Sequence, residues 1–144
     1  MTATQASRIT GLEIREIDGE YGRHVCYGAF EADGTEIARA DSLHPKDALN
    51  RLVGILYQRT SYRVMHEQGF RCFSCGRLVP LQIDHIKKRS HGRDDTRLNL
   101  RAVGPECHEL RHGKNAELKP HPKVLEAVKR HAGLIWHDGG WRER

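Results

Sequence analysis

The sequence of 144 residues lacks any apolar run long enough to span a membrane, and it contains no internal repeat or low-complexity tract. Its first residues, from Met1 to Arg8, show no apolar stretch followed by a small-residue cleavage site, as a secretory leader would. We therefore expect a cytoplasmic protein that has no membrane partner.

Cysteine is also scarce, with 4 residues in the chain. Three of them, Cys72, Cys75 and Cys107, stand at metal-ligand spacing in a His-rich segment, and Cys26 lies apart. This distribution argues against a disulfide framework and indicates a reducing compartment. Cys26 itself falls on an expected strand, and its simplest interpretation is a small buried apolar residue.

The charge of the chain is unevenly distributed around a net value of +5. Residues 1–69 hold 8 basic and 10 acidic side chains, whereas residues 70–119 hold 11 basic and 6 acidic ones. A basic segment favours a polyanionic partner such as nucleic acid. The segment around the cysteines is thus the part in which we expect a phosphate backbone to bind.

Three segments with partial polar–apolar alternation, residues 9–17, 23–31 and 35–40, predict a three-stranded antiparallel meander. The dipeptides Asp18-Gly19 and Asp33-Gly34 between them suit tight turns with positive φ angles. A helix is then expected, with Ser42 as its cap and Pro45 in its first turn. Its apolar positions recur at helical spacing from Ala48 to Val64, and it should end before Gly69.

These elements predict an N-terminal accessory lobe over residues 1–68 and a second domain over residues 69–144. The β-β-β-α order occurs in small nucleic-acid-binding modules and in many unrelated domains, so we favour a packing or dimer-contact role for the lobe. Near the C-terminus we expect a helix over residues 122–131 and a short strand over residues 134–136. Trp136 and Trp141 are more typical of core packing than of base stacking.

The most informative stretch runs from Cys72 to His112, where Cys72-x2-Cys75, Asp84-His85, Asn99 and Cys107-His108 follow in order. These residues, with the spacing His85-x13-Asn99-x8-His108, resemble the HNH endonuclease family over roughly a third of the chain. The resemblance implies an α+β fold with a ββα-metal core around residues 70–119, preceded by the small three-stranded antiparallel sheet and its helix.

The resemblance also implies roles for the motif residues. His85 would be the general base that activates water, because imidazole accepts protons near neutral pH. Asp84 and His108 would hold a catalytic Mg²⁺ or Mn²⁺, with Asp84 on the opposite side of its strand from His85. Asn99 would support His85 by hydrogen bonding across the loop.

The loop between the two halves of the motif carries basic side chains that are candidate phosphate contacts. They are Lys87, Lys88, Arg89, Arg93 and Arg97. Gly92 suits the turn that we expect in this loop. The partner is most simply double-stranded DNA, although the sequence leaves RNA open. One active site cuts one strand, so a double-strand break would need a homodimer or two encounters.

The three cysteines would bind a structural Zn²⁺, but family members with such a clip usually have a fourth cysteine at the position of Gly104. Two alternatives involve His112. It completes the zinc site, which we favour because a structural zinc has four ligands, or it shares the face of His108 and joins the catalytic ion. A zinc ligand from His66, His91 or water, or the lack of zinc, stays open.

The sequence therefore predicts a metal-dependent HNH endonuclease that hydrolyses DNA. The alternative is a non-catalytic, zinc-stabilised DNA-binding module on the same scaffold, which would not need Asp84, His85 and His108 together. A toxin-type nuclease is a further option that no recognisable delivery segment supports.

Overall fold

The computed structural model describes residues 1–19, 21–113 and 117–144, without the side chains of residues 112 and 113. The chain divides into two compact units. The N-terminal unit comprises Met1–Arg59 and Arg93–Thr96, and the motif unit comprises Thr60–Gly92 and Arg97–Arg144. Within the described residues, no helix combines the length and the apolar character that crossing a membrane requires.

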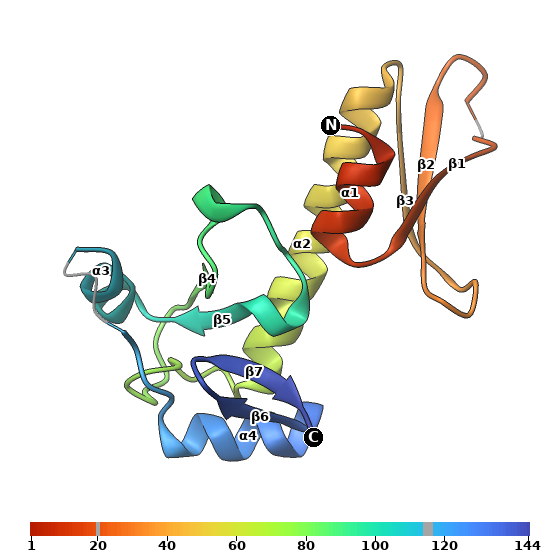
Figure 1. Cartoon of the computed structure of the whole chain (residues 1–144). Coiled ribbons are helices and arrows are strands. Elements are labelled where there is room, and N and C mark those ends of the chain that lie inside the picture. The colour runs from red at the N-terminus through yellow and green to blue at the C-terminus, as the bar shows by residue number, and fades with distance from the viewer. Residues whose placement is uncertain (20, 114–116) are drawn as a thin grey trace. The chain divides into compact units, whose positions relative to one another are not determined.

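The N-terminal unit contains the predicted three-stranded antiparallel sheet, in the order β1-β2-β3 (Figure 1). Its strands are β1 (Glu13–Ile17), β2 (Val25–Phe30) and β3 (Glu36–Ser42). The turn between β2 and β3 is as expected, because Gly34 has a φ of 89° and the Asp33 carboxylate accepts from the Thr35 amide at 2.9 Å. The first connection is longer than a tight turn, since residues 18–24 separate the strands and Gly19 has no positive φ.

The first predicted strand began too early, because residues 3–10 form helix α1 (Ala3–Thr10). A capping box starts this helix: the Thr2 hydroxyl accepts from the Gln5 amide, and the Gln5 side chain accepts from the Thr2 amide. Gly11 ends it in the left-handed region with a φ of 74°. The predicted strand and the helix overlap only at Ile9 and Thr10, and Ile9 belongs to the buried face of the helix together with Ala6.

Helix α2 (Pro45–Glu67) follows the sheet and runs from the N-terminal unit into the motif unit. It starts later than its predicted cap, because Ser42 still pairs with Val25 in the sheet. It ends before Gly69, as predicted. The core of the N-terminal unit forms where α1, α2 and one face of the sheet pack together. Its fully buried side chains include Ala6, Ala29, Leu49, Leu52 and Val53.

The motif unit contains a β-β-α arrangement and a C-terminal helix and hairpin. The first part consists of β4 (Gln82–His85), β5 (Leu100–Val103) and α3 (Pro105–Gly113), with β4 and β5 antiparallel. The second part consists of α4 (Pro122–Ala132), β6 (Leu134–His137) and β7 (Gly140–Glu143). The helix and the strand predicted near the C-terminus are present, and β7, which pairs with β6, was not predicted.

The core of the motif unit is aromatic at its centre. Trp141 is buried, and its ring centroid lies 5.0 Å from that of Trp136 and 5.9 Å from that of Phe73. Edge-to-face packing of this kind stabilises a core. The core role expected for this tryptophan pair is thus confirmed.

Gln68, which directly follows α2, connects that helix to β5 inside the motif unit. The side chain is fully buried, accepts from the Ala102 amide at 2.9 Å and donates to the Ala102 carbonyl at 3.0 Å. It therefore satisfies both polar backbone groups of a residue in β5, as a neighbouring strand would.

We predict that Gln68→Met lowers the free energy of unfolding by about 1–3 kcal/mol, because it leaves the Ala102 amide buried without its partner, whereas the Ala102 carbonyl keeps its hydrogen bond from the Phe73 amide. Chemical denaturation followed by circular dichroism measures the change. Gln58→Met makes the same exchange at an exposed position of α2 and should change stability by less than about 0.5 kcal/mol. Equal losses in both variants would contradict the bridging role of Gln68.

Candidate active site and metal centre

The antiparallel pairing of β4 with β5 positions the two central motif residues. Asp84 lies opposite Arg101, and His85 lies opposite Leu100. Because successive side chains of a strand alternate, Asp84 and His85 face different sides. Asp84 is 3% exposed, whereas His85 is only half-buried. The strand therefore buries the carboxylate and brings the imidazole towards solvent.

The carboxylate of Asp84 is held by side chains from two other elements. Its Oδ2 lies 2.9 Å from Nε of Arg101 on β5 and 3.0 Å from Nε of Arg111 on α3. Its Oδ1 lies 4.0 Å from Nε2 of His108, also on α3. Burial lowers the pKa of Arg101, and its hydrogen bond to Asp84 acts in the opposite direction. The two guanidinium groups fix the carboxylate so that one oxygen faces His108.

Arg111 contacts the chain on both sides of His85, at Asp84 and at Ile86. Besides its contact with Asp84, it donates from Nη2 to the carbonyl of Ile86 at 2.9 Å. It stands three residues after His108, so both side chains lie on one face of α3. The sequence analysis did not identify Arg101 or Arg111. The only feature of the sequence that could have identified Arg111 was its position three residues after His108.

Asn99 fixes the backbone that follows His85. Its side-chain oxygen accepts from the Lys87 amide at 2.8 Å, and its side-chain nitrogen donates to the Lys87 carbonyl at 3.3 Å. Its own carbonyl accepts from the Ile86 amide at 2.8 Å. Asn99 is buried and closes the base of the loop. These contacts are the kind that a residue supporting His85 would make.

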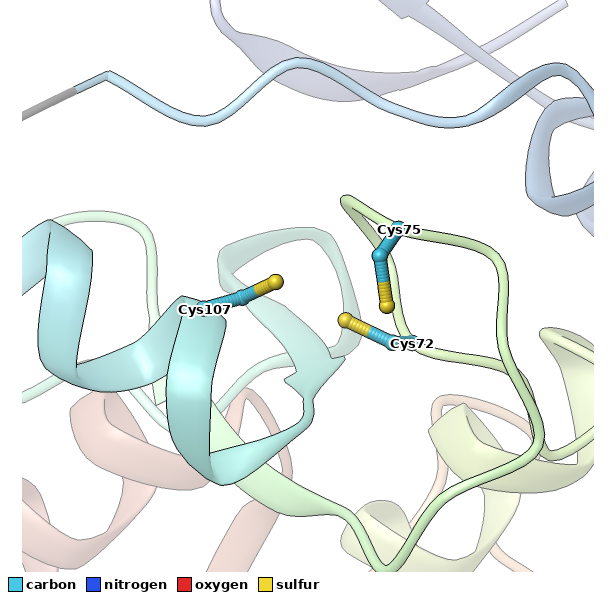
Figure 2. A group of neighbouring side chains, drawn as sticks. All are labelled: Cys72, Cys75 and Cys107. Atoms are coloured by element: carbon cyan, nitrogen blue, oxygen red, sulfur yellow. The ribbon is translucent and has the colours of Figure 1, made fainter.

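The three cysteine side chains point towards one another, Cys72 and Cys75 from a turn before β4 and Cys107 from α3 (Figure 2). Their sulfur atoms all lie within 4.8 Å of one another. Thiolates bound to one tetrahedral zinc at about 2.3 Å would lie somewhat closer together. The Cys72 amide donates to the Arg77 carbonyl at 2.9 Å, and the Gly104 amide approaches Cys72 Sγ at 3.3 Å. The donor set and its spacing therefore fit a zinc ion.

The cysteine thiols differ in acidity. Burial and the neighbouring thiols of Cys72 and Cys75 raise the pKa of Cys107 to about 11. Burial also acts to raise the pKa of Cys75, but its hydrogen bonds with Arg77, Cys72 and Cys107 together outweigh burial and lower that pKa to about 7. Zinc binding requires thiolates, so it would displace the proton of Cys107.

Gly104, where the related pattern has a fourth cysteine, lies beside this cluster. An ideal Cβ at position 104 would lie 3.8 Å from Cys72 Sγ and 2.8 Å from Cγ2 of Val79. A cavity of about 230 Å³ borders Gly104, Cys75 and Cys107. His112, which the sequence analysis favoured as the fourth zinc ligand, has its side chain outside the described residues. Its role stays a prediction.

His121, to which the sequence analysis gave no role, packs against the cysteine turn. Its amide donates to the Phe73 carbonyl at 2.8 Å, and its ring would lie 2.6 Å from a Cβ at Gly76. Its Nδ1 accepts from the Lys123 amide at 3.1 Å, so a neutral ring carries its proton on Nε2. In that form neither nitrogen offers a lone pair to a metal, and His121 has a structural role here.

The five predicted phosphate contacts fall into two groups. Lys87 and Arg89 are exposed, and Lys88 between them is half-buried. Arg93 forms an ion pair with Asp95, with Nη2 2.9 Å from Oδ2. Arg97 is 9% exposed, pairs with Glu67 and donates to the Leu100 carbonyl at 3.1 Å. Arg93 and Arg97 are thus engaged in contacts within the protein.

The model of the HNH endonuclease family matches residues 72–114, which contain the three cysteines, β4, β5 and α3. This segment is an HNH domain. No curated protein and no solved structure is similar enough to the chain to count as a match. The HNH domain indicates a nuclease-type or DNA-binding function, and its cysteine cluster has the composition of a zinc site.

We predict that the purified protein contains about one zinc ion per chain, and that Cys75→Ser and Cys107→Ser lose most of it, because each removes one of three thiolate ligands. Elemental analysis after dialysis measures the content. Cys26→Ala is the control, because Cys26 is buried in the N-terminal unit and absent from the cluster. Zinc retained by both serine variants would show that the cluster does not hold it.

Proposed function

We propose that this protein is a metal-dependent HNH endonuclease that hydrolyses phosphodiester bonds of DNA. The observation that carries this proposal is the placement of Asp84 Oδ1 4.0 Å from His108 Nε2, beside His85 on the same strand. Oxygen and nitrogen ligands that share one ion at about 2.1 Å lie roughly 3–4 Å apart. The pair therefore has the separation and donor chemistry of a divalent-cation site.

Each residue of the site has a separate role in the proposed reaction. His85 takes the proton of the attacking water as general base. Asp84 and His108 hold the cation, and Arg101 and Arg111 keep Asp84 turned towards it. When bound, Mg²⁺ or Mn²⁺ supplies Lewis-acid stabilisation of the charge on the phosphoryl oxygens and the leaving oxygen.

The segment after His85 would bind the substrate. Lys87, Lys88 and Arg89 carry three positive charges next to the general base, where the DNA backbone must lie. Asn99 supports them, because it fixes both polar backbone groups of Lys87. We leave Arg93 and Arg97 out of this DNA contact, since their guanidinium groups are paired within the protein.

His112 remains with two alternatives. The sequence analysis favours the zinc site with the three cysteines, and the alternative is the catalytic ion with Asp84 and His108. The His112→Ala variant distinguishes the two alternatives. If the variant loses its zinc, His112 is a ligand of the zinc site; if it keeps its full zinc content and cleaves DNA less well, His112 is a ligand of the catalytic ion.

A non-catalytic DNA-binding module is the second candidate. Two guanidinium groups on one oxygen of Asp84 already neutralise its charge, as in a structural ion pair. A protein of this kind would bind DNA through the same basic residues without cutting it. The cleavage assay separates the two functions.

We predict that His85→Ala lowers plasmid cleavage with Mg²⁺ or Mn²⁺ by at least about 100-fold, because it removes the general base. Gel electrophoresis of supercoiled plasmid measures the nicked and linear products. His137→Ala, at an exposed position of β6, should cut at the wild-type rate. Activity that survives His85→Ala would exclude this mechanism, and a wild-type protein that binds DNA without cutting would support the second candidate.

We also predict that Arg111→Lys lowers turnover at saturating DNA by about 10- to 100-fold, because one ammonium cannot replace the fork that contacts Asp84 and the Ile86 carbonyl. The Mg²⁺ concentration for half-maximal rate should rise, while DNA affinity stays within about two-fold because the charge is kept. Arg130→Lys, on the exposed face of α4, is the matched control. A loss of DNA affinity without a change in Mg²⁺ dependence would refute this role.

A further inference from the structure

Four aromatic side chains lie together on the surface of the motif unit, where α2 ends. Tyr62 and His66 belong to the last turns of α2, Phe70 follows that helix, and His131 belongs to the last turn of α4. We call these four residues the aromatic patch. The ring centroid of Phe70 lies 6.2 Å from that of Tyr62 and 5.9 Å from that of His66, and the His66 centroid lies 5.6 Å from that of His131.

The aromatic patch is open to solvent, although phenylalanine side chains are usually buried. Tyr62 is 65% exposed, Phe70 is 44% exposed, and both histidines are exposed. Phe70 contacts Tyr62 and His66 in edge-to-face arrangements, and such a contact covers at most one face of each ring. Ring faces are therefore open to a planar partner from outside the protein.

The backbone holds Phe70 at this surface in a strained conformation. Its φ of 59° lies in the left-handed region, which a bulky residue rarely adopts. Gly69 before it has a φ of 67°, and the Phe70 amide donates to the Met65 carbonyl at 2.9 Å, so two left-handed residues follow α2 in succession. Glycine or asparagine would adopt this backbone with less strain. An exposed ring on a strained residue is an indication of a binding role.

A hollow of about 550 Å³ adjoins the aromatic patch. On one side it is lined by Arg63, which follows Tyr62 in α2, and on another by Ala132, which follows His131. Arg97 also lines it. The Nη2 of Arg97 is buried and has no hydrogen-bond partner within the described part of the chain. An anion in the hollow would supply the kind of acceptor that this guanidinium lacks.

Basic side chains outnumber acidic ones around the hollow. Arg63, with its side chain 64% exposed, pairs with Glu67, and the same carboxylate pairs with Arg97. One buried carboxylate thus serves two guanidinium groups. The last turn of α4 adds Lys129 and Arg130. This excess of positive charge beside exposed rings is complementary to a polyanion that carries planar groups.

Single-stranded nucleic acid has this chemistry, because its bases are free to stack on aromatic rings while its phosphates contact basic side chains. The bases of a duplex stack on one another, so they cannot use the ring faces in this way. The aromatic patch and the hollow therefore fit an unpaired strand better than a continuous double helix.

We propose that the aromatic patch and the hollow form a second DNA-contact surface of the motif unit, in which Tyr62, His66 and Phe70 stack on unpaired bases and Arg63 contacts their phosphates. This inference rests on the proposed DNA function, and it specifies the form of DNA that the protein prefers: a duplex that continues into a single-stranded segment. A surface for a second protein chain is the alternative, which the oligomeric state distinguishes.

The test uses the zinc-loaded, full-length chain with His85→Ala, so that no cleavage occurs. Kd is measured for a duplex with a single-stranded extension of thymidines and for the same duplex with an extension of abasic nucleotides. Both extensions carry the same phosphates, and they differ only in their bases. We expect the thymidine extension to bind about 5- to 20-fold more tightly, because it alone can stack.

Two variants remove rings from the patch. Phe70→Asn and Tyr62→Ser should each reduce the preference for thymidine over abasic extensions to about two-fold or less, and leave the Kd for a blunt duplex within about two-fold of wild type. Phe70→Asn should not lower the melting temperature, because asparagine accepts the left-handed conformation, so a loss of binding cannot be a loss of fold. Phe70→Tyr keeps a ring and should keep the preference. Tyr21→Ser is the control, because Tyr21 is 61% exposed in the N-terminal unit.

A further variant separates the phosphate contact from stacking. Arg63→Gln should weaken the binding of both extensions equally and lower the slope of log Kd against log salt concentration by about 1, because one phosphate contact is lost. The preference for thymidine over abasic extensions should remain, since the rings are unchanged.

Three results would overturn the proposal. The first is an equal affinity of the wild-type surface for thymidine and abasic extensions, and the second is a preference that survives both Phe70→Asn and Tyr62→Ser. The third is a change of oligomeric state in these variants, measured by analytical ultracentrifugation, with unchanged DNA affinity, which would assign the patch to a protein partner. Binding to no DNA at all would refute the proposed function together with this inference. A protein that binds a blunt duplex without responding to the bases of the extension would refute only the inference.

Discussion

The motif unit depends on the pairing of one buried carboxylate. Asp84 comes from β4, and its partners Arg101 and Arg111 come from β5 and α3, so the three elements of the HNH domain meet at a single charged group. An unpaired carboxylate at this depth would be strongly destabilising. The same contacts that satisfy the charge therefore fix the position of α3, and with it the positions of His108 and Cys107.

This arrangement connects the cysteine cluster to the residues around Asp84 through α3. Cys107 and His108 are neighbours on α3, and the first faces the other two cysteines while the second faces Asp84. A small unit gains less from apolar burial than a large one, so a metal clip and a charged cluster contribute more of its stability. The cluster departs from the four-cysteine pattern at Gly104, where a Cβ would come within 2.8 Å of Cγ2 of Val79.

The residues that make up the N-terminal unit bear on how its role is interpreted. Its sheet and two helices form a separate core, which by itself indicates an independent packing lobe. Residues 93–96, which come from the loop between β4 and β5, also belong to this unit.

Local patterns carried much of the information in this sequence. The Cys-x2-Cys spacing, Asp84-His85 and Cys107-His108 identified the HNH domain, because metal chemistry restricts both residue types and their separations. The meander, helix α2 and helix α4 followed from turn dipeptides and helical periodicity. The capping box of α1 is also local, with Thr2 and Gln5 three residues apart, but the sequence analysis predicted no helix there.

The tertiary structure decided which charged residues face each other. Arg97 and Arg93 look like Lys87 and Arg89 in the sequence, and only folding shows that the first two pair with Glu67 and Asp95. His121 packs against the cysteine turn from a position well beyond the motif. The sequence by itself determined the kind of chemistry and the elements that carry it. The partners of each charge were decided by the fold, because Coulomb energy and burial depend on distances that the order of residues does not specify.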